Sequence, residues 1–194
     1  MTLVVHPLTP GRWDDLETLF NAKGCSVARG CWCMYYRISG KGAYTRPGDD
    51  QRSRSKEALK ALAANDPPPG LLGYRGRIPV GWISLGPRED YAKLAKSPTM
   101  KPVDARHVWS IVCFVVPSEY RKQGVARELL AGAVDYAKKR GVRLLEAYPV
   151  DKRQPSAPEA PWFGSKTMFD EAGFTEVARR KAARPVVRLK LIPG

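Results

Sequence analysis

The chain has 194 residues, a length that favours a single domain. Hydrophobic residues make up 43% and charged residues 27% of it, which is close to ordinary globular usage and excludes global disorder. The densest apolar run, residues 111–116, is far shorter than the roughly 20 residues of a membrane-spanning helix. The first residues also lack the basic and apolar regions of a secretory signal, so we expect a cytoplasmic protein with no membrane partner.

The net charge is the unusual quantity. Lys and Arg number 33 against 19 Asp and Glu, which gives +14 at pH 7. Such an excess favours an anionic partner, which is a nucleic acid, a phosphorylated cofactor or an acidic protein. The alternative is that the charge serves solubility alone.

The first third of the sequence predicts one strand and two helices around an irregular segment. Residues 3–8 are typical of a strand, and a helix is indicated by the spacing of Trp13, Leu16, Leu19 and Phe20. Residues 24–50 are irregular and hold three cysteines and several aromatic residues. Good helix formers follow at 52–65, and the prolines at 67–69 end that helix.

The remainder predicts most of a sheet. Residues 71–75 and 80–85 are typical of an antiparallel hairpin, and the apolar run at 107–116 is typical of a central strand. The later elements are a helix at 125–139, a strand at 143–150, a short helix at 167–172 and strands at 175–180 and 186–191. A strand, helix and strand in succession make the two strands parallel neighbours. The fold class is therefore mixed α/β, with most other strands antiparallel.

The segment Arg121-Lys122-Gln123-Gly124-Val125-Ala126 joins the central strand to the longest helix. The first amides of a helix have no intrahelical acceptor, and the helix dipole adds positive charge there. A glycine turn beside two cations at this point predicts a site for phosphate or pyrophosphate. The alternative is an ordinary strand-to-helix turn with two solvated cations.

This segment resembles the acetyl-CoA-binding motif of the GNAT superfamily of N-acetyltransferases, R/Q-x-x-G-x-G/A, through Arg121, Gly124 and Ala126. The downstream run from Met168 to Phe174 is similar to the family's closing helix and strand. The resemblance implies one domain over residues 1–194 with a GNAT-like fold, in which helices flank a mostly antiparallel sheet with one parallel, splayed strand pair. It places the cofactor-binding core at about 107–174 and an acceptor lid at about 24–50.

The resemblance also implies an acetyl-CoA-dependent N-acetyltransferase, without a metal, in which an amine acceptor attacks the thioester directly. Backbone amides near the turn would hold the CoA pyrophosphate, and the end of the preceding strand would hold the pantetheine arm. The residues expected to bind acetyl-CoA are Phe114, Val115, Val116, Arg121, Lys122, Gln123, Gly124, Val125 and Ala126. The protein would contribute mainly proximity and a polarised carbonyl.

Three features depart from the family pattern. The usual proline before the motif is displaced to Pro117, with Ser118 in its place, and the usual asparagine after the fifth strand is missing. Phe169 stands where the family often has the tyrosine that protonates the leaving thiolate. Tyr148, another group or water would then supply the proton, or the thiolate leaves unaided.

Glu146 is the first candidate for a general base, because it is the carboxylate within the strand at 143–150. Glu89 and Asp90 are the next candidates. Strand alternation puts Glu146 and Tyr148 on the same face, so both are expected catalytic residues. The alternative is that Glu146 faces outward into solvent.

Trp32, Tyr35, Tyr36 and Trp162 are the expected acceptor-pocket residues, because aromatic rings grip amines and aromatic acceptors. The alternative is a hydrophobic cluster beneath the lid. The spacing of Cys25, Cys31 and Cys33 does not match a zinc site, and a redox or metal role would need them to converge. Cys113 lies in the central strand and is typical of a small buried hydrophobic residue.

The C-terminal strands are rich in cations, which are Arg179, Arg180, Lys181, Arg184, Arg188 and Lys190, with Glu176 as the nearby carboxylate. We expect them to form a solvated sheet face, or else a patch for an acidic partner. The alternative function is therefore a non-catalytic GNAT-fold module that binds RNA or an acidic protein. A homodimer is a further expectation.

Overall fold

A computed structural model describes residues 2–39, 49–154 and 160–191 of the chain. Its helices are α1 (Trp13–Asn21), α2 (Ser26–Cys31), α3 (Asp49–Leu62), α4 (Ala92–Ala95), α5 (Val125–Lys139) and α6 (Lys166–Glu171). Its strands are β1 (Val4–Pro7), β2 (Gly70–Arg75), β3 (Ile78–Pro87), β4 (Trp109–Val115), β5 (Leu144–Ala147), β6 (Thr175–Lys181) and β7 (Arg184–Lys190).

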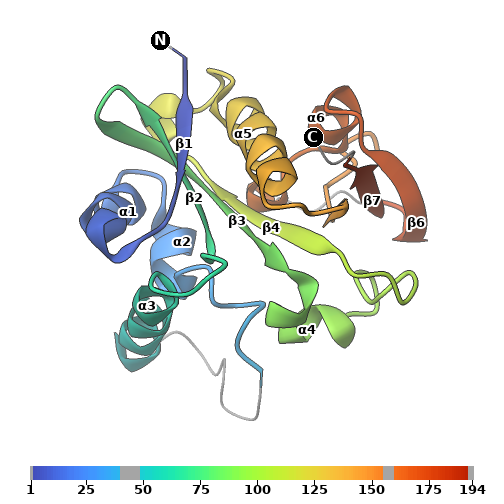
Figure 1. Ribbon diagram of the computed structural model, residues 1–194, viewed down its shortest axis with the longest axis horizontal. Helices are drawn as coiled ribbons and strands as arrows, with labels where there is room; N and C mark the ends of the chain where they lie inside the picture. Colours follow the sequence, from blue (N-terminus) through green and yellow to red (C-terminus); the bar gives the residue numbers. More distant parts are fainter. Residues whose placement is uncertain (1, 40–48, 155–159, 192–194) are drawn as a thin grey trace.

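The strands form one seven-stranded sheet in the order β1-β2-β3-β4-β5-β7-β6. The β4–β5 pair is parallel and every other neighbouring pair is antiparallel. Figure 1 shows β1 to β4 side by side, with β6, β7 and α6 at the opposite side of the molecule from α1 and α3. The predicted mixed α/β class with one parallel pair is confirmed.

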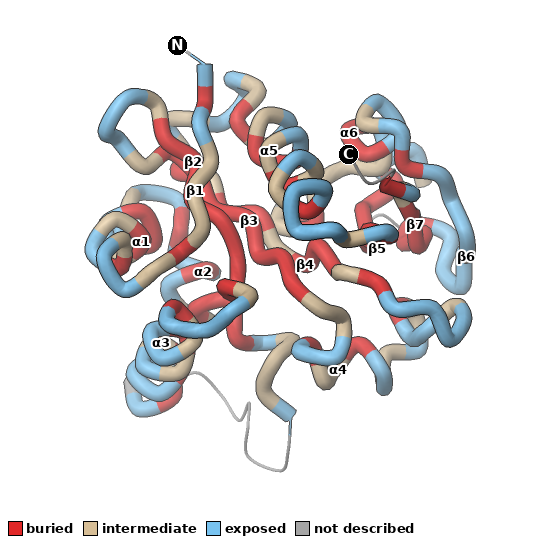
Figure 2. The backbone as a smooth tube through the Cα atoms, viewed as in Figure 1, coloured by how far each residue is buried: buried red, intermediate tan, exposed pale blue. Residues whose placement is uncertain are grey.

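Helices cover both faces of the sheet, as strand alternation requires. On β3, Ile83 and Leu85 belong to the same buried cluster as Leu129 of α5, while the adjacent Trp82 belongs to the cluster that contains α1. Helix α5 lies so close to the sheet that a Cβ at Gly73 or Gly81 would be 2.7 Å from the Leu129 side chain. Figure 2 shows the central strands β2, β3 and β4 as mostly buried, whereas β6 is mostly exposed.

The parallel pair separates after three residues. Trp109, Ser110 and Ile111 pair with β5, but β4 continues to Val115 beside β3 alone. After β5 the backbone pairs with residues 164–166 instead of β4. The Val150 amide donates to Gly164 O at 3.0 Å, and the Lys166 amide donates to Val150 O at 2.9 Å. These bonds satisfy the backbone of Val150 and leave one edge of β4 open.

Several boundaries differ from the predicted ones. The strand predicted at 143–150 ends at Ala147, because the backbone then turns toward Gly164. The short helices α2 and α4 were not predicted, since six and four residues are too few for a clear helical period.

The predicted solvated face of the C-terminal strands is wrong for two of its cations. Arg184 and Arg188 are buried, and Arg188 donates to Asp104 and Glu146 at 2.7 Å each. Both carboxylates come from other parts of the chain, so the local sequence around β7 could not reveal them. Within the described ranges, no helix combines the length and the apolar character needed to cross a membrane.

Candidate active site

A cleft of about 1640 Å³ opens where β4 leaves β5. One wall is the second half of β4, and another contains Val150, Gly164 and Ser165. The lining also includes the turn before α5 and the segment around α2. This volume exceeds the roughly 300–1,000 Å³ of a pocket for one small molecule, so the cleft has room for two substrates.

The turn before α5 has the backbone geometry of an anion site. Gly124 caps the helix with a φ of 81°, a conformation that glycine adopts without strain. A Cβ at Gly124 would meet nothing closer than Glu128 Oε1 at 3.8 Å, so the turn is open. Val125 and Ala126 begin the helix, and their amides have no acceptor one turn earlier. The dipole of α5 adds positive charge at the same point.

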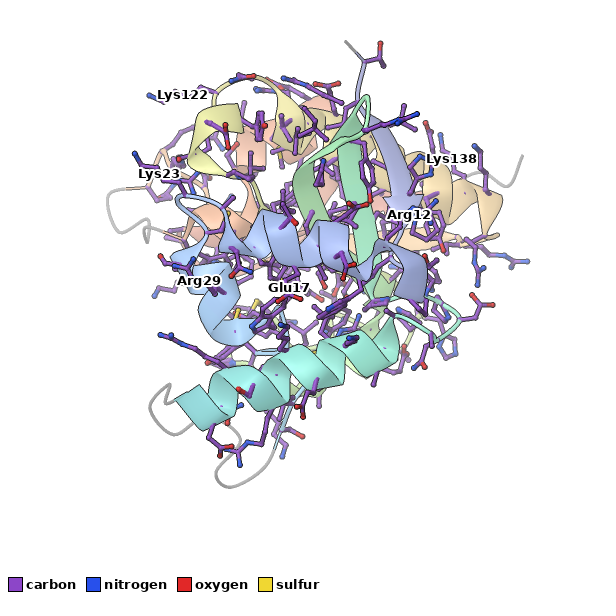
Figure 3. The ribbon with its side chains drawn as sticks, turned by 90° about the vertical axis from the view of Figure 1, so that its left-hand side faces the viewer. Arg12, Glu17, Lys23, Arg29, Lys122 and Lys138 are labelled. Atoms are coloured by element: carbon purple, nitrogen blue, oxygen red, sulfur yellow. The ribbon has the colours of Figure 1, made fainter. Side chains whose placement is uncertain are left out.

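The cations beside this turn have different roles. Arg121 Nε donates to Val116 O at 3.0 Å and its Nη2 donates to Gly24 O at 2.6 Å, so this side chain ties the turn to two other segments. Arg127 pairs with Glu171 at 2.8 Å. Lys122 is exposed and lies on the same side of the molecule as Lys23 and Arg29 in Figure 3. Lys23 and Arg29 belong to the segment around α2, which also lines the cleft, so cations flank the cleft on that side of the molecule.

The residues expected to bind acetyl-CoA lie along this cleft, with one exception. The residues that line it are Phe114, Val115, Val116, Arg121, Lys122, Gly124, Val125 and Ala126. Gln123 is absent from the lining and its Oε1 accepts from Arg75 at 2.9 Å.

Aromatic residues line another part of the cleft. Tyr35, Tyr36 and Trp162 line it, and the Tyr36 ring contacts Phe163 edge-on at 5.8 Å. Burial raises the pKa of Tyr36 to about 12, so its hydroxyl is protonated at neutral pH and can donate a hydrogen bond. The buried Arg184 guanidinium lies 3.6 Å from the centre of the Phe163 ring.

Trp32 is not placed in the cleft, contrary to the expectation. It follows α2 with a φ of 47°, and this left-handed conformation turns the side chain toward α1. Its ring stacks on Trp13 at 5.7 Å and contacts Phe20 at 5.2 Å. Trp32 is therefore part of the core beneath the cleft.

Glu146 and Tyr148 do share a face, but they lie outside the cleft lining. Glu146 is fully buried and accepts hydrogen bonds from Arg88 at 2.6 Å, Arg188 at 2.7 Å and the Tyr148 hydroxyl at 2.7 Å. The expectation of an outward-facing, solvated Glu146 is wrong. Burial raises the pKa of Tyr148 well above its ordinary value. A catalytic role for either residue stays a prediction, and this closed network does not favour it.

The other residues considered for proton transfer also lie elsewhere. Asp90 pairs with Arg37 at 3.1 Å, and Glu89 Oε1 lies 3.5 Å from His107 Nδ1. Phe169 is fully buried, and its ring contacts Phe114 and Phe174 edge-on.

The cysteines approach one another in an unexpected combination. Cys33 Sγ lies 3.4 Å from Cys113 Sγ, although Cys113 was expected to be only a packing residue. None of the four cysteines, which all lie in the described part of the chain, is in a disulfide, and all four line the cleft. No group of three or more His, Cys, Asp or Glu side chains suited to a metal ion occurs among the described residues.

Sequence reasoning placed Gly24 and the α2 segment in the predicted lid at 24–50 but did not predict the helix, because six residues have no clear helical period. It missed a second part of the site. Gly164 and Ser165 also line the cleft, and Ser165 caps α6 by accepting from the Met168 amide at 3.3 Å. The Ser-x-x-Met spacing resembles any helix start, so it carried no sign of a site.

Comparison with known proteins agrees with this geometry. The family model described as acetyltransferase (GNAT) family matches residues 33–158. A search of curated proteins finds no significant match. Among solved structures, the fold is similar to an acetyltransferase from Thermus thermophilus at 18% identity and a TM-score of 0.54, covering 98% of each chain. It is similar to PaiA N-acetyltransferase from Thermoplasma acidophilum, solved with coenzyme A, at 16% identity and a TM-score of 0.53, covering 98% of this chain and 99% of that one.

A chain of the NatC complex, solved with Gag peptide and CoA, shares the fold at 13% identity and a TM-score of 0.55. That match covers 99% of this chain and 100% of the other. Identities this low show the fold alone.

Proposed function

Because this chain belongs to the acetyltransferase (GNAT) family, we propose that it is an acetyl-CoA-dependent N-acetyltransferase. In this proposal an amine acceptor attacks the thioester carbonyl directly, and free CoA leaves. Residues 107–174 bind acetyl-CoA, and residues 24–50 provide the acceptor side. Residues 40–48 of that lid lie outside the described residues.

One observation carries the proposal. A single cleft joins the glycine turn at the start of α5 to the open edge of β4, where β5 has moved away. An anion site and an unpaired strand edge in one cleft suit a long ligand with phosphates at one end and an amide-containing arm at the other.

The roles of individual residues follow from this arrangement. The amides from Lys122 to Ala126 bind the pyrophosphate, and Lys122 adds an exposed cation. Arg121 positions the turn, because its guanidinium is bonded to the carbonyls of Val116 and Gly24. The backbone of Phe114, Val115 and Val116 binds the pantetheine arm with the hydrogen-bonding groups that β5 leaves free.

The chemistry needs little from side chains. An amine held against the thioester gains most of its rate from proximity, and a backbone donor polarises the carbonyl as negative charge develops. The acceptor ammonium first loses its proton to water in the cleft, and the neutral amine then attacks the thioester carbonyl. The thiolate of CoA, with an ordinary thiol pKa near 8.5, leaves without a dedicated tyrosine.

The acceptor binds beside the aromatic part of the cleft, where Tyr35, Tyr36 and Trp162 offer ring faces and hydroxyl groups. Rings of this kind attract the positive charge of an amine before it is deprotonated. Small amines, peptide N-termini and lysine side chains all carry the required nucleophile.

Calorimetric titration of the protein with acetyl-CoA tests the proposal, with CoA lacking its 3′-phosphate as a control. We expect saturable binding at one site, followed by thiol release when an amine from a screened panel is added. Absence of binding at millimolar acetyl-CoA would overturn the proposal. Salt-dependent RNA binding by the same protein would then support the non-catalytic module.

A further inference from the structure

Two thiols from distant parts of the chain meet inside the cleft. Cys33 follows α2, Cys113 lies on the open half of β4, and their sulfurs are 3.4 Å apart across 80 residues of sequence. Both are free, and both line the cleft that the proposed function assigns to acetyl-CoA and the acceptor. A small oxidant in the cleft therefore reaches them.

The position of Cys33 is held by an unusual backbone. Trp32 and Cys33 have φ values of 47° and 50°, and two successive left-handed residues without glycine are strained. Such a conformation persists only where the surroundings hold it. Here the Trp32 ring is fixed by Trp13 and Phe20, and the turn directs Cys33 toward β4.

The two thiols are not equivalent. Cys33 is buried and donates its proton to Cys113, and this bond is the largest cause that raises the pKa of Cys33 well above its ordinary value. Cys113 is half-buried and accepts that hydrogen bond. Cys113 is therefore the thiol that meets an oxidant first.

We propose that Cys33 and Cys113 are a modification site, which a peroxide converts to a reversible disulfide that constrains the acceptor side of the cleft. The Cys113 sulfur attacks one oxygen of hydrogen peroxide, the O–O bond breaks, and a sulfenic acid forms. The Cys33 sulfur then attacks the Cys113 sulfur, so that the S–S bond forms and the S–O bond breaks. The two thiol protons and the peroxide leave as two molecules of water.

The bond would change one half of the cleft. The sulfurs must close from 3.4 Å to the roughly 2.05 Å of a disulfide, which draws the segment carrying Tyr35 and Tyr36 toward β4. The turn at Gly124 contains neither cysteine. We therefore expect oxidation to block acetyl transfer and leave CoA binding intact, a consequence that rests on the proposed function.

Peptide mapping tests the bond itself without any activity. The full chain is treated with hydrogen peroxide, its remaining thiols are alkylated, and it is digested with trypsin without reduction. Cleavage at Arg29, Arg37, Arg106 and Arg121 separates residues 30–37 from residues 107–121. We expect these two peptides to be linked in the wild type and released by dithiothreitol.

Variants identify the partners. The link should persist in Cys31→Ser and disappear in Cys113→Ser, while Cys33→Ser should leave a sulfenic acid on Cys113 that dimedone traps. A disulfide confined to residues 30–37 would overturn the proposal. It would also be overturned if the two peptides stayed unlinked, whether Cys113 was oxidised or intact. Titration of the reduced and the oxidised protein with acetyl-CoA distinguishes failure of this proposal from failure of the proposed function. If the two peptides are linked but neither form of the protein binds acetyl-CoA, only the proposed function is contradicted.

Discussion

The two halves of strand β4 differ in whether they pair with β5. In the first half, Trp109 to Ile111 pair with β5, and the neighbouring Glu146 is closed off by two guanidinium groups. In the second half, Val112 to Val115 have lost β5, and the cleft opens there. The region around β4 therefore has buried, paired charge at one end of the strand and accessible backbone at the other. Substitutions at the first end should change stability, and those at the second should change binding.

The largest expected effect is at the paired end. Glu146→Gln should lower the free energy of unfolding by about 3–5 kcal/mol, because it leaves the buried Arg188 and the half-buried Arg88 without their shared charge. Urea unfolding measures this loss, and Glu89→Gln is the control, since its exposed carboxylate should change stability by about 0.5 kcal/mol or less. If Glu146→Gln is as stable as the wild type and shifts the pH profile of acetyl transfer, Glu146 is the general base after all.

At the open end, Gly124→Asp should weaken acetyl-CoA binding about 100-fold, because it places a carboxylate where the phosphates bind. Gly141→Asp is a matched control, since Gly141 also has a positive φ of 71° and an open Cβ position, but lies at the other end of α5. Calorimetry on both variants isolates the contribution of the site from the backbone strain that they share. Equal affinities in the two variants would contradict the proposed phosphate site.

A smaller effect is expected at the acceptor side. Tyr36→Phe removes a hydroxyl that is protonated at neutral pH and should raise the KM for the amine about fivefold, as expected for one lost hydrogen bond of about 1 kcal/mol. Steady-state kinetics with the best amine of the panel measure it. Tyr136→Phe, on α5, serves as a remote control and should leave the KM unchanged. A fall in affinity for acetyl-CoA instead would place Tyr36 with the cofactor.

A further effect concerns the pH dependence of stability. Hydrogen bonds from Arg153, the largest cause, and from Arg179 lower the pKa of Asp151 to about 2, below its ordinary value of about 3.9. A lowered folded-state pKa contributes stability above pH 4 that is lost as the pH falls toward 2. Asp151→Asn should therefore unfold with a shallower acid dependence than the wild type when urea midpoints are compared between pH 5 and pH 2. Parallel curves would show that Asp151 is not responsible.

Long elements with a regular apolar spacing were predictable from the sequence, while contacts between residues far apart in the sequence were not. The apolar spacing from Val125 to Ala137 gave helix boundaries that agree with α5, and the apolar run around Ile111 predicted β4. Trp32 was assigned to the acceptor pocket because composition indicates an aromatic cluster, but the left-handed turn that buries its ring has no sequence signal. The result is one aromatic residue in the core and three at the cleft.

The charged and sulfur contacts illustrate the same limit. Glu146 meets arginines 58 and 42 residues away, and Cys33 meets a thiol 80 residues away. Such pairs depend on sheet order and strand register, and a one-residue shift in register would turn these side chains to the other face. The phosphate turn was predictable because its whole geometry lies within six consecutive residues.

The cleft takes its walls mainly from residues 24–36, 112–127, 150–154 and 160–168, so no part of the chain forms it alone. A ligand that binds there binds only the folded chain, and mass action converts its binding free energy into resistance to unfolding. At a ligand concentration about 100 times the Kd, this resistance amounts to about 2.7 kcal/mol. The lifetime of the protein in a cell is thereby tied to the supply of the molecule that fills the cleft.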